Sequence, residues 1–374
     1  MADLKKAELK LYVWRGDLNG RPETPQYTLT KSLIPGEETI VFEISELIKD
    51  YVTIEFDGNY NNIKQTSWAS WIITRTYDTD PETTDTEEHR AIVFRGYGNV
   101  DDGINPELSK GLLTSNTVFQ NVCGETINIP TYTGFGGATE VVYSQDATEL
   151  SNVVLGSGNP YFISNTTVHL NPPASDIVTI DKTASTVADS QDSLDNSEIP
   201  TNTDKVEITN PDGTVTTVTI ECFDNCKATP HKISFINKFG VMQDVWFFGR
   251  KKDGISAERE SYKKTKLNIL STGASYNTSN HENVYLENQG KEKFTLHTGF
   301  VNEQYNEIIK ELMVSEYVYI HDTTRRSPSD PNFDLAIPVA ISANSLDFKT
   351  RRKDKLIEYE LEFEADSDFV QSIR

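Results

Sequence analysis

The most constraining pattern in this chain is a strict alternation of apolar and acidic residues near its C-terminal end. Residues 356–364 read LIEYELEFE, with apolar side chains at every second position and glutamates between them. Successive side chains of a strand point to opposite faces, so this segment predicts a strand with one buried face. Its other face meets water or a basic partner. Shorter segments of the same kind predict further strands at 9–14, 67–77, 91–97, 140–143, 161–163, 168–170, 206–209, 215–220, 232–237, 245–248, 292–299, 316–321 and 336–342.

Only two segments have the spacing of a helix. Near 42–51, Ile44, Leu47 and Ile48 fall on one stripe, and the segment at about 302–314 repeats apolar residues at i, i+3, i+4, i+7 and i+8. The fold class that we predict is therefore mainly β, with two or three β-sandwich-like domains, two minor helices and long polar loops or arms.

The composition changes along the chain and suggests three regions. Residues 1–125 are expected to form an N-terminal β-domain, in which the apolar-free segment 78–88 is the loop of a long hairpin. Residues 126–229 are rich in Thr, Ser, Asn and Asp and predict an acidic β insertion or arm, whose part from 171 to 205 would become ordered only on contact with a partner. Residues 230–374 are expected to form a C-terminal β-domain.

The charge of the chain limits its partners. The formal net charge of −22 argues against a sequence-specific or general nucleic-acid binder, because such proteins need Lys and Arg to neutralise phosphates. Two basic stretches interrupt the acidity, and the last strand has a face of glutamates. These charged residues are either solvated faces of strands or contacts with surfaces of opposite charge on a neighbouring copy of the chain. The candidate inter-subunit contacts are Arg250, Lys251, Lys252, Lys263, Lys264, Arg351, Arg352, Lys353, Glu358, Glu360 and Glu362.

The cysteine count and the apolar runs bear on where the chain resides. The first residues lack the apolar core of a signal peptide, and no window approaches the roughly 18 apolar residues of a membrane span, so we expect synthesis in a cytoplasm and no membrane partner. Three cysteines, an odd number, argue against a disulfide framework. The sequence leaves open whether Cys222 and Cys226 pair or remain two free thiols.

A search for catalytic and ligand-binding motifs returns no site. The six histidines show no metal-ligand spacing, and the glycine-rich segment 134–137 has neither the dinucleotide-binding nor the P-loop pattern. We therefore predict a protein that is not an enzyme and has no cofactor and no metal. The competing hypothesis of a glycoside hydrolase would need a pair of catalytic carboxylates, and a chain with 57 acidic residues contains such pairs by chance.

Four segments, which together span about half of the chain at its two ends, carry a family resemblance. Residues 232–252 (KISFINKFGVMQDVWFFGRKK) and 292–320 (EKFTLHTGFVNEQYNEIIKELMVSEYVYI) resemble consecutive stretches of proteins from phages and prophages of Bacteroidota. Residues 355–366 (KLIEYELEFEAD) are similar to the final strand of many phage tail and ring proteins, and residues 25–52 are typical of the same group.

The resemblance implies a structural virion protein of crAss-like bacteriophages, a tail or neck ring or a tail hub. It implies a homo-oligomeric ring of 6 or 12 copies, made in the host bacterial cytoplasm, with adjacent tail or portal proteins as further partners. The alternative is a carbohydrate-binding or host-adhesion module, in which Trp68 and Trp71 would contribute to an aromatic platform.

Overall fold

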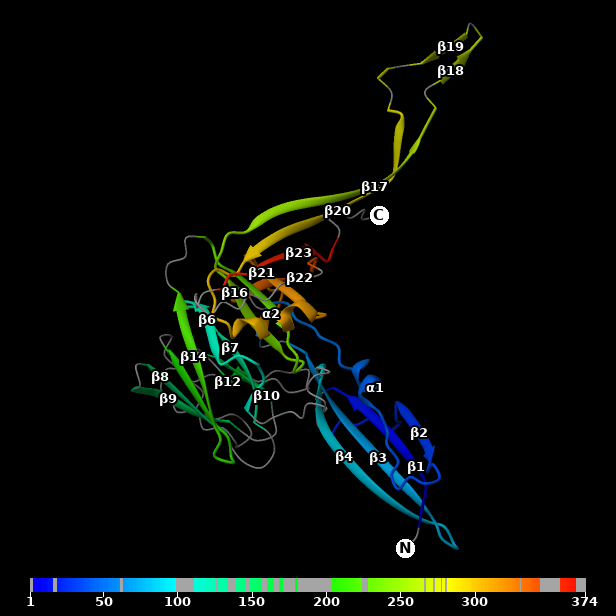
Figure 1. Cartoon of the computed structure of the whole chain (residues 1–374), viewed down its shortest axis with the longest axis vertical. Helices are drawn as coiled ribbons and strands as arrows, with labels where there is room; N and C mark the ends of the chain where they lie inside the picture. Colours follow the sequence, from blue (N-terminus) through cyan, green and yellow to red (C-terminus); the bar gives the residue numbers. More distant parts are fainter. Residues whose placement is uncertain are drawn as a thin grey trace. The chain divides into compact units, whose positions relative to one another are not determined.

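The structure is a computed structural model, and its main architecture agrees with the fold class predicted from the sequence. Among the residues it describes, the protein is mainly β, with several sheets and two short helices (Figure 1). The described residues are 3–15, 19–60, 63–98, 111–125, 127–133, 139–145, 148–155, 160–164, 168–170, 179–180, 203–223, 228–265, 267–271, 273–276, 278–279, 281–329, 331–343 and 357–367.

The chain divides into two compact units that are built from interleaved segments. The first unit contains Met1–Asn225, Lys232–Trp246 and Gln304–Ala336. The second contains Cys226–His231, Phe247–Glu303 and Ile337–Arg374. The division into three consecutive regions stays a prediction.

The first unit begins with a four-stranded antiparallel sheet in the order β2-β1-β3-β4. Leu9, Leu11 and Val13 occupy every second position of β1 and are buried together with Ile48 of the first helix. The predicted helix is therefore confirmed, although it is shorter than expected. The bounds are β1 Asp3–Trp14, β2 Tyr27–Ser32, α1 Ser45–Lys49, β3 Thr66–Asp78 and β4 Thr83–Phe94.

The long hairpin in this sheet is confirmed, but the prediction that all of 78–88 is a loop is wrong. Residues from Thr83 onward pair with β3, starting at Tyr77↔Thr83. This part of the strand has two exposed faces, so no apolar alternation marks it in the sequence. Ion pairs from Arg75 to Asp85 (3.2 Å) and Glu87 (2.5 Å) join it to β3 instead.

Two five-stranded sheets form the middle of the first unit, in the orders β12-β11-β10-β7-β5 and β6-β14-β13-β8-β9. The strands predicted at 206–209 and 215–220 pair with each other as a hairpin, and Gly213 takes the positive φ of +83° that its turn requires. Most of the segment 171–205, which was expected to become ordered only on contact with a partner, lies outside the described residues. The bounds are β5 Gly111–Leu112, β6 Val118–Val122, β7 Asn128–Tyr132, β8 Thr139–Gln145, β9 Thr148–Leu155, β10 Pro160–Ser164, β11 Val168–Leu170, β12 Thr179–Ile180, β13 Lys205–Thr209 and β14 Val215–Phe223.

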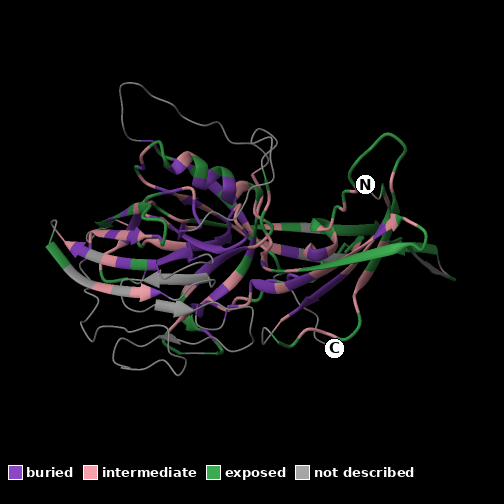
Figure 2. Cartoon of the chain, turned by 90° about the horizontal axis from the view of Figure 1, so that it is seen from below, coloured by how far each residue is buried: buried purple, intermediate pink, exposed green. Residues whose placement is uncertain are grey.

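The first unit also contains β15 (His231–Ile236), β21 (Val318–Arg326) and the second helix, α2 (Tyr305–Val314). The predicted helix is confirmed: it buries Tyr305, Ile308, Ile309 and Leu312 on one face, and Figure 2 shows buried and exposed positions alternating along it. The buried face follows the i, i+3, i+4, i+7 spacing of the sequence.

The second unit contains four strands in the order β22-β23-β20-β17 and a separate two-stranded sheet, β18-β19. Phe363 is fully buried between Phe294 (ring centroids 5.3 Å apart) and Phe247 (5.9 Å). The alternation predicted for the last strand is confirmed, with Leu361 and Phe363 buried. The bounds are β17 Lys252–Lys263, β18 Leu267–Leu270, β19 Gly273–Tyr276, β20 Asn283–His297, β22 Asp334–Ile341 and β23 Glu360–Ala365. Strand β16 (Met242–Phe247) belongs to the first unit up to Trp246, and β22 belongs to the second unit from Ile337 onward.

Candidate functional site

A long two-stranded projection of the second unit is the most distinctive surface of the protein. Strands β17 and β20 pair from Lys252↔Thr295 to Lys263↔Asn283, with one shift of register between Glu260 and Ser261, whereas β23 pairs with β20 only from Lys293 to His297. Residues 254–292, which we call the arm, therefore have no third strand beside them in the part of the chain that the structure describes. Ten paired residues correspond to a length of about 30 Å. Figure 1 shows β17 and β20 running side by side to the β18-β19 hairpin.

The arm carries large apolar side chains that are open to solvent. Six of them have between 49% and 70% of their surface exposed: Ile255, Tyr262, Leu267, Tyr276, Tyr285 and Leu286. In the terminal β18-β19 hairpin, which we call the tip, Leu267 and Tyr276 are directly opposite one another in the pair farthest from the turn, so they share one face. An isolated two-stranded hairpin is marginally stable in water, and clustered exposed apolar residues mark interaction surfaces. The arm is thus a candidate assembly interface.

The arm is also free of the acidic excess of the rest of the chain. Residues 254–292 include five basic and five acidic residues, whereas the whole chain has a formal net charge of −22. The guanidinium of Arg259 lies 5.7 Å from the ring centroid of Tyr285, a cation–π distance. Docking of the arm on another acidic copy is therefore not opposed by its net charge.

The sequence did not single out these apolar residues, because most of the arm reads as a polar stretch. One signal in the sequence could have indicated them, the short apolar run at 284–286, whose residues favour a strand although the segments on either side of it are polar. The basic residues that the sequence did single out lie on the same element. Arg250, Lys251 and Lys252 are at the start of β17, and Lys263 and Lys264 are at its end, so they form two groups and not one cluster.

The glutamates of the last strand face solvent but already have partners within the chain. Glu360 lies 3.0 Å from Lys252 and 3.4 Å from His297 Nε2, and Glu358 lies 3.8 Å from His297 Nδ1. Glu362 is exposed on the same face. The role of these residues as inter-subunit contacts stays a prediction. Arg351, Arg352 and Lys353 lie outside the described residues.

The first unit contains a pocket of about 330 Å³ beside α2. Its wall includes Arg95, which donates hydrogen bonds to Glu316 (2.8 and 3.1 Å) and lies 5.4 Å from the ring centroid of Tyr317. Ile236, Tyr97 and Val314 also line it. The pocket thus has aromatic and aliphatic walls with a charged rim.

A buried carboxylate lies at the same pocket. Glu311 Oε1 accepts a hydrogen bond from Ser115 Oγ (2.6 Å), and its Oε2 accepts one from the backbone N–H of Lys238 (3.3 Å). Burial raises the pKa of Glu311 above its usual value, and it also raises the pKa of Tyr97. The two hydrogen bonds hold the Glu311 carboxylate in place at the pocket.

A serine–histidine pair is present in the core of the first unit. Ser234 Oγ lies 2.7 Å from His321 Nε2, which is a distance expected of a nucleophile and its base. Ser234 has no exposed surface, however, and its hydroxyl donates to Asp244. A substrate cannot reach the Ser234 hydroxyl in this structure.

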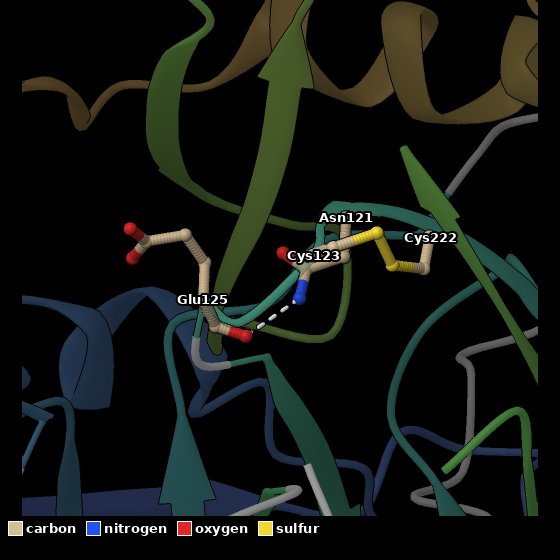
Figure 3. Close-up of a disulfide and its surroundings, with 4 residues drawn as sticks. All are labelled: Asn121, Cys123, Glu125 and Cys222. Atoms are coloured by element: carbon tan, nitrogen blue, oxygen red, sulfur yellow. Dashed lines mark hydrogen bonds between the residues drawn. A yellow bond between two sulfur atoms is a disulfide. The ribbon is translucent and has the colours of Figure 1, made fainter. Parts of the chain in front are cut away.

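Cys222 forms a disulfide with Cys123 (Figure 3). Neither of the two alternatives left open by the sequence, a bond with Cys226 or a free thiol, is therefore correct for Cys222. The parallel pairing of β14 with β6 aligns Cys222 with Asn121, and the Cys123 N–H donates to Phe223 O. The two Cα atoms are consequently 5.0 Å apart. The sequence did not indicate this pair, because pairing across a sheet brings together residues that are 99 positions apart in the chain. Cys226 lies outside the described residues.

Two further searches of the described residues are negative. No group of three or more His, Cys, Asp or Glu side chains is arranged to hold a metal ion. No helix in the described part of the chain is long and apolar enough to cross a membrane.

Comparison of the chain with protein-family models, with curated proteins and with solved structures finds no match.

Proposed function

We propose that this chain is a non-enzymatic structural component of a bacteriophage virion, which forms an oligomeric ring in the tail or neck and joins neighbouring rings around the DNA conduit. The observation that carries the proposal is the arm, with six large apolar side chains exposed along a strand pair that has no covering layer among the described residues. A protein that exposes this surface needs a partner to bury it. The resemblance of the chain ends to phage tail and ring proteins supplies the biological setting.

The chemistry of the arm favours a contact between copies. One copy would offer the arm and the next a different surface, which is a heterologous contact, and such contacts generate closed rings when the rotation between copies closes. The formal charge of −22 suits a subunit near DNA that must not retain it, because binding to phosphates needs an excess of Lys and Arg.

The alternative function, a carbohydrate-binding module, has weaker structural support than the assembly function. Trp68 and Trp71 were its expected platform, and both are only partly exposed. Trp68 packs against the cluster around Ile92, and Trp71 packs against the cluster around Leu9 while its ring stacks on His89 at 5.7 Å. Partly buried rings offer little flat surface to a sugar.

The test compares the full chain with a variant whose arm is shortened. In the variant, a two-residue Asn-Gly turn replaces 257–290 and joins Ser256 to Lys291, which are opposite one another in the register. We expect native mass spectrometry and negative-stain imaging to show rings of 6 or 12 copies for the full chain, and a folded monomer for the variant. A full chain that stays monomeric alone and with virion lysate would refute the proposal.

A further inference from the structure

We infer that the tip of the arm of one copy inserts Tyr276 and Leu267 into the α2 pocket of a second copy. This inference rests on the proposed function and specifies the contact between neighbouring copies. The occupant of the pocket is the tip of a second copy of this chain.

The pocket has the size and the lining for such a guest. Its volume of about 330 Å³ is at the lower end of the range of roughly 300–1,000 Å³ for ligand sites, which suits one or two side chains better than a cofactor. The polar wall groups already have partners, since Arg95 binds Glu316 and Glu311 binds Ser115. Beside these groups the pocket offers a guest apolar and aromatic surface from Tyr97, Val314 and Tyr317, and Val314 is 58% exposed.

The tip of the arm presents a matching knob. Tyr276 is 70% exposed and Leu267 is 55% exposed, and their direct cross-strand pairing places both side chains on one face of the hairpin. A tyrosine combines an apolar ring with a polar end, so it can enter an apolar pocket while its hydroxyl meets the charged rim of Glu307 and Lys310. That rim carries one charge of each sign, and the arm is itself charge-balanced.

The tip supplies only part of the area of such a contact. A buried aromatic residue contributes on the order of 150–250 Å², so Tyr276, which is 70% exposed, offers roughly 150 Å², and Leu267 adds to it. A standard interface buries about 800 Å² on each partner, so the contact also needs the rest of the arm, where Ile255, Tyr262, Tyr285 and Leu286 are exposed. The knob and the pocket are different surfaces, so the contact is heterologous, as the proposed ring requires.

A site-specific photo-crosslinker tests where the tip docks. With p-benzoylphenylalanine in place of Tyr276 in the full chain, we expect irradiation to give a covalent dimer whose cross-linked peptide contains residues 305–317. The same group in place of Val215, an exposed valine on β14, is the control and should not label that peptide. A cross-link to another segment, or one within a single chain, would overturn the inference and leave the ring intact.

Filling the pocket provides a second, independent test. Val314→Trp should obstruct the pocket and raise the concentration needed for half-assembly at least 10-fold, as measured by mass photometry. Val215→Trp is the matched control, because Val215 is 55% exposed and belongs to the same unit, and it should assemble as the wild type does. Thermal melting of both variants establishes that they are folded. Wild-type assembly of the Val314→Trp protein would overturn the docking, whereas absence of assembly in the wild type would refute the proposed function itself.

Discussion

Ser234 Oγ and His321 Nε2 lie 2.7 Å apart inside the core of the first unit, in a hydrogen-bonded group that has almost no contact with solvent. Asp244 accepts hydrogen bonds from the hydroxyls of Ser234 and Tyr60, and also from Asn128 Nδ2 at 3.2 Å. The group joins strands that are far apart in the sequence. Burial lowers the pKa of His321 well below its usual value, with a smaller contribution from Lys232, so the imidazole is neutral in the folded protein.

The buried histidine predicts that the protein loses stability in mild acid. The imidazole in the unfolded chain takes up a proton near pH 6.5, but the buried one does so only at lower pH, so the unfolded state binds more protons below pH 6.5. Wild-type stability should fall from about pH 6.5 downward, by up to ~1.4 kcal/mol per pH unit from this group. His321→Gln removes the titration and should give a flatter profile, from a lower starting stability.

Urea denaturation at pH 7.5, 6.5 and 5.5 measures the difference between the two profiles. His281→Gln, at an exposed histidine, is the matched control and should reproduce the wild-type profile. Parallel profiles for wild type and His321→Gln would show that the imidazole does not contribute.

The sequence predicted those elements whose side chains meet a core. β23 and α2 were identified because burial on one face imposes a period of two or of 3.6 residues. Leu361 and Phe363 in the strand, and Ile308 and Leu312 in the helix, are all buried as their spacing implies. The strands at 206–209 and 215–220 were identified in the same way, and the turn between them has a local cause, the positive φ of Gly213.

The sequence did not predict features that depend on contacts without a period. Residues 83–88 and most of the arm are strands with both faces exposed, so their pairing leaves no apolar pattern. The interleaving of the two units and the bond between Cys123 and Cys222 depend on residues that are distant in sequence. The candidate site was missed for the same reason, because exposed apolar residues such as Tyr276 resemble ordinary loop residues when they have no visible partner.

The disulfide predicts a measurable contribution to stability. Cys222→Ser releases a loop of about 100 residues in the unfolded chain, since the two cysteines are 99 positions apart. We expect a loss of ~2–5 kcal/mol, measured by denaturation without reductant. Dithiothreitol should reduce the stability of the wild type toward that of the variant and leave the variant unchanged. Alkylation of three cysteines in unreduced, denatured wild-type protein would contradict the bond.

The aromatic core of the second unit predicts a large effect at one position. Phe363→Ala leaves a cavity between Phe294 and Phe247 and should cost ~3–5 kcal/mol of unfolding free energy. Phe300→Ala is the control, because Phe300 belongs to the same unit but is 66% exposed, and its loss should stay within about 1 kcal/mol. Equal losses for the two variants would contradict the packing described for this sheet.

Two matching turns in the first unit separate the cost of a positive φ from the cost of a close backbone approach. Gly213 and Gly240 have φ of +83° and +79°, and each N–H donates to the carbonyl of an asparagine three residues earlier at 2.9 Å. A Cβ at Gly213 would meet nothing within 4 Å, whereas one at Gly240 would lie 2.5 Å from the carbonyl carbon of Arg95. The two turns therefore share a backbone shape and differ in what lies beside them.

Gly213→Ala should consequently cost only the strain of the left-handed conformation, about 1 kcal/mol. Gly240→Ala adds a clash that displaces Arg95, whose guanidinium holds Glu316 at the wall of the pocket, and should cost ~3 kcal/mol or more. Chemical denaturation of both variants gives the comparison. A Gly240→Ala protein as stable as Gly213→Ala would mean that the turn does not rest against Arg95. If the larger loss is found, the same variant should also assemble poorly, because the wall of the proposed docking pocket depends on that contact.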